Sequence, residues 1–350
     1  MFLNKSLSIY KNKKVLITGH NGFVGSWLTS SLIKLKSKVY GVSLKNKNKG
    51  FKFVVNEKSQ LKEFIQDIND YDKINFLIKK INPDFIFHLA AQPIVNIGYQ
   101  RPLETIKTNI LGTANILESI KRNKIKHSVI ITSDKCYLNK ENKKLFKEDS
   151  EIGGDDVYSA SKACAEIITR SFYLSFKDKY SFIDTVRAGN IIGGGDFGSK
   201  RLLPDIFKSA HSNKILQVRS PFSIRPWQNV LDVITAYLLI PINQKKRSYK
   251  YDVWNVGPDK NESSIRVLDI INKLKIFNKK KFKFKITKKK FKESFFLRLD
   301  NKKIKKIGWS NGNTIDSTLS QTVKWYDLYY NSKKKELIKF TNYLIEKNLT

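Results

Sequence analysis

Cysteine is scarce in this chain of 350 residues, which contains only Cys136 and Cys164. Neither of them belongs to a motif with the spacing of metal ligands, and two thiols are too few for a disulfide framework. We therefore predict that the protein holds no metal and no disulfide scaffold, and that it works in a reducing compartment.

Long hydrophobic runs are also missing. The longest, at residues 233–240, is far shorter than the roughly 20 residues that a membrane-spanning helix needs. Residues 1–14 are polar and contain lysines, without the apolar centre of a signal peptide. These absences predict a cytoplasmic protein with no membrane partner.

Acidic residues are few, at 31 Asp and Glu against 66 Lys and Arg, so the formal net charge is +35. Such an excess is typical of proteins that bind nucleic acids or anionic membranes. Here the lysines are scattered, apart from a dense run at residues 279–292, and many Asn, Ile and Phe residues with similarly A/T-rich codons accompany them. We interpret the charge as compositional bias and predict no nucleic-acid partner, although the field would attract a polyanionic nucleotide.

Hydrophobic residues make up 41% of the chain, enough for a globular protein of one large unit or two domains. Apolar runs that predict strands alternate with segments of helical periodicity. Strands are expected at 13–18, 39–43, 64–68, 83–89, 128–131 and 182–187. One helix is expected from the glycine loop to about residue 36, a second after the third strand and ending at residue 80, and two more at 103–122 and 158–176. This alternation predicts an α/β fold with a Rossmann-type doubly wound parallel sheet.

The regular alternation ends after Arg187. Residues 189–196 are glycine-rich and predict a loop over the site. Further on we expect an apolar segment at 230–240, a helix at 263–274 capped by Ser263 or Ser264, an exposed strand at 281–287, and helices at 314–330 and 334–347. We predict a cofactor domain at 1–190 with a return segment at about 228–258, and a smaller C-terminal α/β substrate-binding domain at 191–227 and 259–350.

Three glycines, Gly19, Gly22 and Gly25, follow the first predicted strand and open a helix. In that position they let the backbone approach a dinucleotide pyrophosphate, whose charge the helix N-terminus stabilises. No acidic residue lies between Gly25 and Glu57 to hold a ribose hydroxyl, and Ser43 occupies the end of the second strand. This loop therefore leaves the preference for NAD or NADP open.

A cluster of reactive side chains is predicted at the carboxyl end of the fifth strand, where open α/β sheets place their ligands. Ser133, Asp134 and Lys135 follow that strand, while Tyr158 and Lys162 share one helix face at i and i+4. A lysine cation beside a tyrosine favours the phenolate, which can take a proton from an alcohol during hydride transfer. The alternatives are a surface Tyr–Lys pair and a strand-end ion pair between Asp134 and Lys135.

These residues resemble a known family, the extended short-chain dehydrogenase/reductases that modify nucleotide sugars. The resemblance rests on the glycine loop at 18–25, on His88, Leu89, Ala90 and Ala91, on Asn109, and on Tyr158 with Lys162. Within the family the chain is most similar to the CDP-glucose 4,6-dehydratase subgroup, through segments 91–95, 132–137, 161–166, 187–196, 201–205, 225–231, 299–300 and 325–326. In the dTDP-glucose dehydratases an Asp-Glu pair stands where this chain has Asp134 and Lys135.

The resemblance implies an internal redox cycle on CDP-glucose with NAD as cofactor. Tyr158 would deprotonate the C4 hydroxyl, Lys135 would remove the C5 proton, and Asp134 would protonate the departing C6 hydroxyl. Ser133 and Lys162 would complete the catalytic set. Implied NAD contacts are Gly19, Asn21, Gly22, Phe23, Val24, Gly25, Asp67, Ile68, Leu89, Ala90, Ala91, Asn109, Tyr158 and Lys162. Implied substrate contacts are Gln92, Asn190, Arg201, Leu202 and Arg225.

The resemblance also implies a homodimer or homotetramer assembled through the helices at 103–122 and 158–176. Departures from the family pattern are few. Phe197 and Gly198 stand where many members have Trp-Ala, and the helix past residue 330 is extra. Another nucleotide-sugar 4,6-dehydratase, acting on dTDP-, GDP- or UDP-sugars, and a 4-epimerase of the same fold remain the alternative functions.

Overall fold

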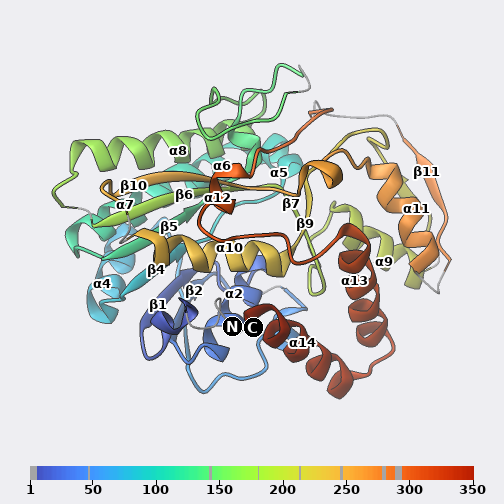
Figure 1. The fold of residues 1–350 in the computed structure, drawn as a ribbon, viewed down its shortest axis with the longest axis horizontal. Helices are drawn as coiled ribbons and strands as arrows, with labels where there is room; N and C mark the ends of the chain where they lie inside the picture. Colours follow the sequence, from blue (N-terminus) through green and yellow to red (C-terminus); the bar gives the residue numbers. More distant parts are fainter. Residues whose placement is uncertain are drawn as a thin grey trace.

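A seven-stranded parallel sheet forms the centre of the molecule (Figure 1). The computed structural model describes residues 6–45, 48–141, 144–179, 181–212, 214–244, 247–277, 281–287 and 294–350. The strand order is β10-β6-β5-β4-β1-β2-β3. The chain adds β2 and β3 on one side of β1 and then crosses to add β4 and the later strands on the other side, so the strand order switches between β1 and β4. The strands are β1 (Lys14–Thr18), β2 (Lys38–Ser43), β3 (Leu61–Ile65), β4 (Phe85–His88), β5 (His127–Ile131), β6 (Phe182–Ala188) and β10 (Tyr251–Val256). The predicted doubly wound parallel sheet is confirmed.

Alternate residues of the central strands point to opposite faces of the sheet, and each face has its own core. Leu16 and Ile86 contribute to one core, with α4 (Tyr71–Ile81) and α7 (Gly112–Arg122) packed on that side. Val15 and Phe87 contribute to the other, larger core with α2 (Phe23–Lys34) and α10 (Val230–Asn243). Helices therefore cover both faces, which explains why the central strands are apolar without alternation.

The third strand lies three residues earlier than predicted, at Leu61–Ile65 rather than 64–68. It is the edge strand of the sheet and pairs with β2 from Val39↔Leu61 to Ser43↔Ile65. An edge strand buries little, and the Ile65 side chain is 75% exposed. The apolar residues of this strand therefore do not define its ends in the sequence. Asp67 and Ile68 lie just beyond the end of the strand.

The long helix predicted at 103–122 is continuous but contains a wider turn. It comprises α6 (Pro102–Ile106), a π-helical turn η2 (Lys107–Leu111) and α7. Such π turns are rare and often occur at functional sites. Here the turn contains Asn109, a residue that the sequence assigned to the cofactor.

Two predictions for the second half of the chain are wrong in detail. The glycine-rich segment at 189–196 begins with a short strand, β7 (Asn190–Ile192), which pairs with β9 (Trp227–Asn229), so only its second part is a loop. The helix expected at 263–274 is α11 (Val267–Phe277), and neither Ser263 nor Ser264 caps it. Instead the Asp269 carboxylate accepts from the Arg266 N–H at its start, because a 3-10 turn, η5 (Lys260–Glu262), occupies the preceding residues.

The remaining elements are α3 (Phe51–Val54), α5 (Val95–Gln100), α8 (Val157–Ser175), α9 (Leu202–Ser212), β8 (Leu216–Val218), β11 (Phe284–Ile286), α12 (Lys302–Lys305), α13 (Ile315–Tyr330) and α14 (Lys334–Leu349), with the 3-10 turns η1 (Ser8–Tyr10) and η3 (Asp134–Cys136). Of these elements, α8 lies at the upper left of Figure 1, whereas α9, β11 and α13 lie at the right. β11 confirms the strand expected at 281–287, whereas much of the lysine run at 279–292 lies outside the described residues. No helix of the described segments is long and apolar enough to cross a membrane.

The C-terminal helix α14 belongs to the larger core. In Figure 1 it (dark red) returns from α13 to the helices that follow the first strands (blue). Leu337 and Ile345 are fully buried, and the Lys34 ammonium on α2 pairs with Glu346 at 3.2 Å. The helix therefore ties the end of the chain to α2, the helix that begins at the glycine loop.

We expect Ile345→Ala to lower the free energy of unfolding by ~2–5 kcal/mol, because it leaves a cavity in a packed core. The matched control is Tyr343→Ala, on the same helix but 54% exposed, which should change it by less than about 1 kcal/mol. Equilibrium urea unfolding of both variants measures the difference. Equal losses would show that α14 is not packed as described.

Candidate active site

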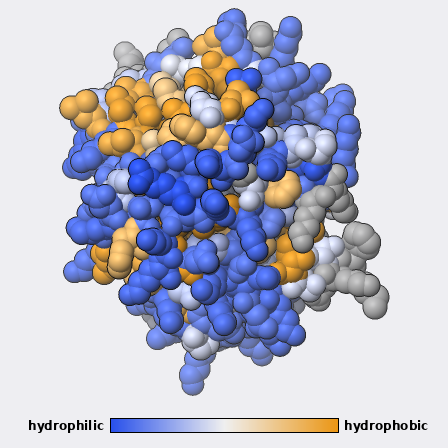
Figure 2. All heavy atoms as spheres, turned by 90° about the vertical axis from the view of Figure 1, so that its left-hand side faces the viewer, coloured by the Kyte–Doolittle hydropathy of each residue, from blue (hydrophilic) through white to orange (hydrophobic). Residues whose placement is uncertain are grey.

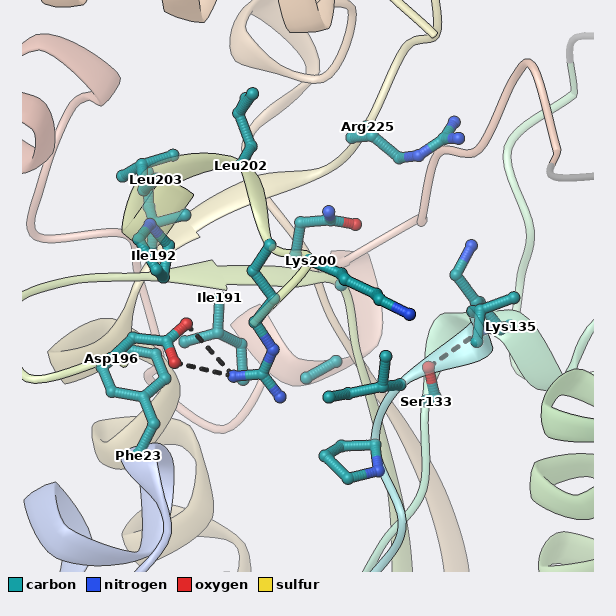
Figure 3. A pocket seen from close by; sticks show the side chains of 18 of the residues that line it. Phe23, Ser133, Lys135, Ile191, Ile192, Asp196, Lys200, Leu202, Leu203 and Arg225 are labelled. Atoms are coloured by element: carbon teal, nitrogen blue, oxygen red, sulfur yellow. Dashed lines mark hydrogen bonds and ion pairs between the residues drawn. The ribbon is translucent and has the colours of Figure 1, made fainter. Parts of the chain in front are cut away.

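The predicted catalytic residues line one cavity of about 410 Å³ at the carboxyl ends of the central strands (Figure 3). In that view Ser133 and Lys135 lie on the opposite side of the cavity from Asp196. The predicted site residues that line the cavity are Phe23, Val24, Leu89, Ala91, Ser133, Asp134, Lys135, Tyr158, Lys162, Asn190, Arg201, Leu202 and Arg225. The fold thus gathers residues from the turn after β5, from α8 and from the 190–225 region around one space.

Ser133 is fixed by the turn that follows β5. It caps the 3-10 turn η3, because its Oγ accepts from the Lys135 N–H at 3.2 Å. The same Oγ donates to Oδ1 of Asp134 at 3.0 Å. This geometry directs three consecutive side chains with different chemistry to the cavity.

Asp134 is the buried acid of the site, with only 3% of its surface exposed. Burial raises the pKa of its carboxyl, and the Lys135 charge only partly opposes this effect. Its Oδ2 atom is buried and has no hydrogen-bond partner among the described residues. A carboxyl held in this way favours the neutral form, which can donate a proton.

Tyr158 and Lys162 stand one turn apart near the start of α8. The helix is capped by Asp156, whose carboxylate accepts from the Ser159 N–H at 3.0 Å. Burial raises the pKa of Tyr158 to about 12, although hydrogen bonding with Ser133 lowers it. The net lowering of the tyrosine pKa that the sequence predicted is therefore wrong, because desolvation of the phenolate outweighs the favourable contacts.

Lys162 is itself buried, with 6% of its surface exposed. Burial lowers its pKa to about 8, against the opposing effect of the Glu166 charge. Its Nζ donates to the Ile131 carbonyl at the end of β5, at 3.4 Å. The ammonium is thus held between the tyrosine helix and the strand that carries Ser133.

The glycine loop between β1 and α2 comes too close to other backbone for side chains. Gly19 has φ +74°, and a Cβ there would lie 2.8 Å from the Ala90 N. A Cβ on Gly25 would lie 2.1 Å from the Gly19 carbonyl oxygen. The loop is held to the end of β2 by Asn21, whose amide donates to the Leu44 carbonyl at 2.9 Å. An open helix N-terminus with this close turn is suited to bind an anion.

Asn109 and Gln92 lie beside the cavity rather than in its lining. The Asn109 amide donates to Ser161 Oγ at 2.9 Å and its carbonyl accepts from the Gln92 N–H at 2.8 Å. The Gln92 amide donates to Thr105 Oγ1 at 2.8 Å, and its carbonyl oxygen accepts from the Ile94 N–H at 2.6 Å. Both residues fasten the segment after β4 to α8 and α6, so the substrate role of Gln92 stays a prediction.

Asp67 and Ile68 occupy the turn after β3, outside the cavity lining. The Asp67 carboxylate accepts from the Asn69 N–H at 2.9 Å. Ile68 packs closely against Gly112, and its carbonyl accepts from the Asn115 amide at 2.9 Å. The Ala90 N–H, at the end of β4, donates to Thr18 Oγ1 at 3.2 Å. The cofactor roles of Asp67, Ile68 and Ala90 also stay predictions.

The candidate phosphate-binding arginines are both anchored in the protein. Arg201 pairs with Asp196 through one nitrogen, because its Nη1 donates to both carboxylate oxygens, at 3.0 and 3.1 Å (Figure 3). Arg225 is 5% exposed and donates to the Ile224 carbonyl at 2.8 Å. Such anchoring directs guanidinium groups along the cavity wall, where they can meet phosphate oxygens.

Several lining residues were missed from the sequence. Lys200 reaches Asn96 of α5 across the cavity, and Arg219 follows β8. Neither basic residue belongs to a pattern that distinguishes it among 66 Lys and Arg. Asp196 ends the glycine-rich motif and could have been selected as a partner for a nearby arginine.

Comparison with known proteins identifies relatives of the whole chain. A family model described as GDP-mannose 4,6 dehydratase matches residues 16–322. The CDP-glucose 4,6-dehydratase of Salmonella typhimurium is 36% identical over 330 residues, which are 91% of this chain and 92% of the relative. A trifunctional UDP-glucose 4,6-dehydratase/UDP-4-keto-6-deoxy-D-glucose 3,5-epimerase/UDP-4-keto-L-rhamnose-reductase of Arabidopsis thaliana is 28% identical over 91% of this chain. The match covers 48% of that relative, about half of its length.

Solved structures share the fold at lower identity. An epimerase from Methanothermobacter thermautotrophicus has a TM-score of 0.83 at 22% identity, covering 97% of this chain and 98% of that one. A UDP-glucose 4-epimerase of Thermus thermophilus in complex with NAD has a TM-score of 0.78 at 18% identity, covering 90% and 99%.

The family model matches most of the sequence, and the relative at 36% identity aligns almost end to end. The chain therefore belongs to the GDP-mannose 4,6 dehydratase family, within the extended short-chain dehydrogenase/reductases.

Proposed function

We propose that this protein is an NAD-dependent hydro-lyase that converts CDP-D-glucose to CDP-4-keto-6-deoxy-D-glucose and water. The observation that carries the proposal is the Asp134–Lys135 acid–base pair, which lines the same cavity as Tyr158 and Lys162. Oxidation of an alcohol requires one base, whereas elimination of water beside the resulting ketone requires a further base and an acid. The similarity to a CDP-glucose 4,6-dehydratase supports both the reaction and the nucleotide.

Each protein residue has a role in the proposed reaction that agrees with its environment. Tyr158 accepts the proton of the C4 hydroxyl, with Ser133 hydrogen-bonded to the same oxygen and Lys162 stabilising the phenolate. Lys135 removes the C5 proton, which is acidic because of the adjacent ketone. Asp134, whose pKa is raised by burial, donates a proton to the C6 hydroxyl so that water leaves.

The glycine loop fits a dinucleotide, because Gly19 and Gly25 allow a tight turn from β1 into α2, whose N-terminal N–H groups suit a pyrophosphate. When bound, NAD supplies the hydride acceptor for C4 and the hydride donor for C6, and its oxidised ring adds a positive charge that favours the Tyr158 phenolate. The complex of a solved neighbour with NAD supports this choice of cofactor. We assign 1–190 and 228–258 to the cofactor, and 191–227 and 259–350 to the sugar nucleotide.

The charge of the cavity lining is also complementary to that of a nucleoside diphosphate sugar. The basic lining residues Lys200, Arg201, Arg219 and Arg225 outnumber the acidic residues of the same wall, Asp196 and Asp205. Asn190 lies at the start of β7 on this wall and adds an amide. This excess of positive charge would attract a pyrophosphate group.

The runner-up is a 4-epimerase or a dehydratase for another nucleotide sugar. The solved neighbours include UDP-glucose 4-epimerases of the same fold. An epimerase needs no acid and base besides the tyrosine, so the buried Asp134 favours the dehydratase. The nucleotide itself is supported by the relative alone.

We further propose that two copies of the chain associate through α6, α7 and α8. The face that carries these helices, at the left of Figure 1, has a hydrophobic area in its upper part (Figure 2). Exposed apolar side chains on or next to these helices are Leu103, Ile106, Leu111, Ile167, Leu174 and Phe176. A contiguous apolar face on a soluble enzyme marks an interface, and a second copy offers the same face about a two-fold axis.

The purified protein with NAD should produce a new C6 methyl signal in proton NMR with CDP-glucose and not with dTDP-, GDP- or UDP-glucose. The methyl group arises because the C6 hydroxyl is replaced by hydride. A methyl signal with another nucleotide would retain the reaction and correct the substrate. A sugar inverted at C4 without a methyl signal would establish the epimerase.

Asp134→Asn and Lys135→Met should each lower the rate of methyl formation by about 10²–10⁴-fold, because each removes one proton-transfer group. Oxidation at C4 should persist and can be followed by the absorbance of reduced nicotinamide in a single turnover. Lys140→Met is the matched control, since Lys140 is 64% exposed in a surface ion pair. Full methyl formation in both site variants would show that Asp134 and Lys135 form only a structural ion pair at the strand end.

The double variant Ile167→Glu/Leu174→Glu should be a monomer in light scattering, whereas the wild type should be a dimer or tetramer. Charges placed on the apolar faces of both partners repel each other and oppose the burial of these faces. Phe76→Glu, at an apolar residue of α4 that is 65% exposed, should leave the oligomer intact. A monomeric wild type would refute the interface.

A further inference from the structure

A buried ion pair that the proposed reaction does not use lies behind the catalytic lysine. Glu166 of α8 and Arg187 of β6 pair through Oε2 and Nη2 at 2.9 Å, and their side chains are 1% and 2% exposed. Neither residue lines the cavity. Burying two charges is unfavourable unless they are closely paired and hydrogen-bonded, so this pair needs a physical explanation.

The Glu166 carboxylate is held by three side chains, two from β6 and one from the end of β5. Thr185 Oγ1 on β6 donates to its Oε2 at 2.7 Å, beside the Arg187 guanidinium. Thr132 Oγ1 donates to its Oε1, and Thr132 directly precedes Ser133 at the end of β5. The carboxylate therefore links the strand end that carries Ser133 to the helix that carries Tyr158 and Lys162.

Arg187 extends this support to the other side of the pair. Its Nη1 donates to the Tyr137 hydroxyl at 2.8 Å and to the Glu148 carbonyl at 3.0 Å. The Tyr137 hydroxyl in turn donates to Asn255 Oδ1 on β10 at 2.6 Å. The position of the carboxylate is thus fixed by a connected network, which limits its movement when the cavity changes its contents.

Glu166 follows Lys162 by four residues, as Lys162 follows Tyr158. Residues at i, i+4 and i+8 lie along one face of a helix. The Lys162 ammonium is buried, which disfavours its charge, and Glu166 opposes this effect most strongly. The helix spacing therefore places a fixed negative charge one turn beyond Lys162 on the same helix face.

Three other groups near Lys162, a histidine, a thiol and the tyrosine, carry little charge at neutral pH. His88 of β4 is fully buried and its pKa is lowered to about 3, so it is neutral. Burial raises the pKa of the Cys136 thiol in η3 well above its usual value. Tyr158, with a pKa of about 12, is also neutral. Of the groups that shift the pKa of Lys162, Glu166 is therefore the one that contributes a charge, through the carboxylate that pairs with Arg187.

We propose that Glu166 is a positioning residue whose carboxylate keeps the Lys162 ammonium charged and aimed at Tyr158. The role rests on the proposed function, in which that ammonium stabilises the tyrosinate. Arg187, Thr185 and Thr132 act through Glu166 by fixing its carboxylate. Glu166 touches neither the substrate nor the reacting atoms.

Glu166→Gln keeps the shape of the side chain and removes its charge, while Asp184→Asn is the matched control. Asp184 lies on the same strand as Arg187 and is fully buried. Its Oδ1 pairs with Nη1 of Arg247 at 2.8 Å, and neither residue lines the cavity. Both variants lose a buried ion pair, so both should have a lower Tm. Only Glu166→Gln should change a property that depends on Lys162.

The first measurement is the pH dependence of kcat/KM for methyl formation. The charged lysine is present below its pKa, so losing Glu166 should move the alkaline limb to lower pH by on the order of one unit, about a tenfold loss on that limb. Glu166→Asp should restore part of this shift. The limb of Asp184→Asn should coincide with that of the wild type, and a coincident limb for Glu166→Gln would overturn the proposal.

The second measurement requires no turnover, so it still tests the coupling if the proposed reaction is wrong. In the wild type the attraction between Glu166 and Lys162 exists below about pH 8, where Lys162 is charged, and disappears above it. The Tm deficit of Glu166→Gln should therefore shrink between pH 7 and about 9.5, while that of Asp184→Asn stays constant. Parallel deficits would show that Glu166 has only a structural role.

Discussion

The desolvation of ionisable side chains at the carboxyl end of β5 is the constraint on which the site depends. Asp134, Tyr158 and Lys162 are all buried there. Burial raises the pKa of Asp134 and Tyr158 and lowers that of Lys162, so it favours the neutral form of each side chain. A neutral acid suits proton donation, but a neutral lysine would not assist a tyrosinate. The structure therefore needs a compensating charge near Lys162, and the Glu166 carboxylate, which Arg187 holds in place, provides it.

The sheet makes this arrangement possible. Parallel strands end along one edge, so that residues following β1, β4 and β5 meet although they are far apart in sequence. Hydrogen bonds then connect the strand ends with each other and with α8, as between Thr132 and Glu166 or between Asn109 and Ser161. The glycine loop and the acid–base pair consequently occupy neighbouring parts of one rigid frame.

The second half of the chain completes the cavity from the opposite side. The Asp196–Arg201 pair lies on that side, and the Tyr326 hydroxyl of α13 donates to the Asp196 carbonyl. Trp325 packs against Gly194 and donates to Thr341 of α14 at 3.0 Å. The C-terminal helix thus supports the loop that presents the basic side chains to the cavity.

The sequence by itself determined the parallel sheet, the glycine loop and the catalytic cluster. Strand–helix alternation and the i, i+4 spacing of Tyr158 and Lys162 are local patterns that burial and helix geometry impose directly. Only the tertiary structure decided the register of β3, the pairing of β7 with β9, and the inward contacts of Gln92. It also decided the raised pKa of Tyr158, because strand pairing and desolvation depend on neighbours that are distant along the chain.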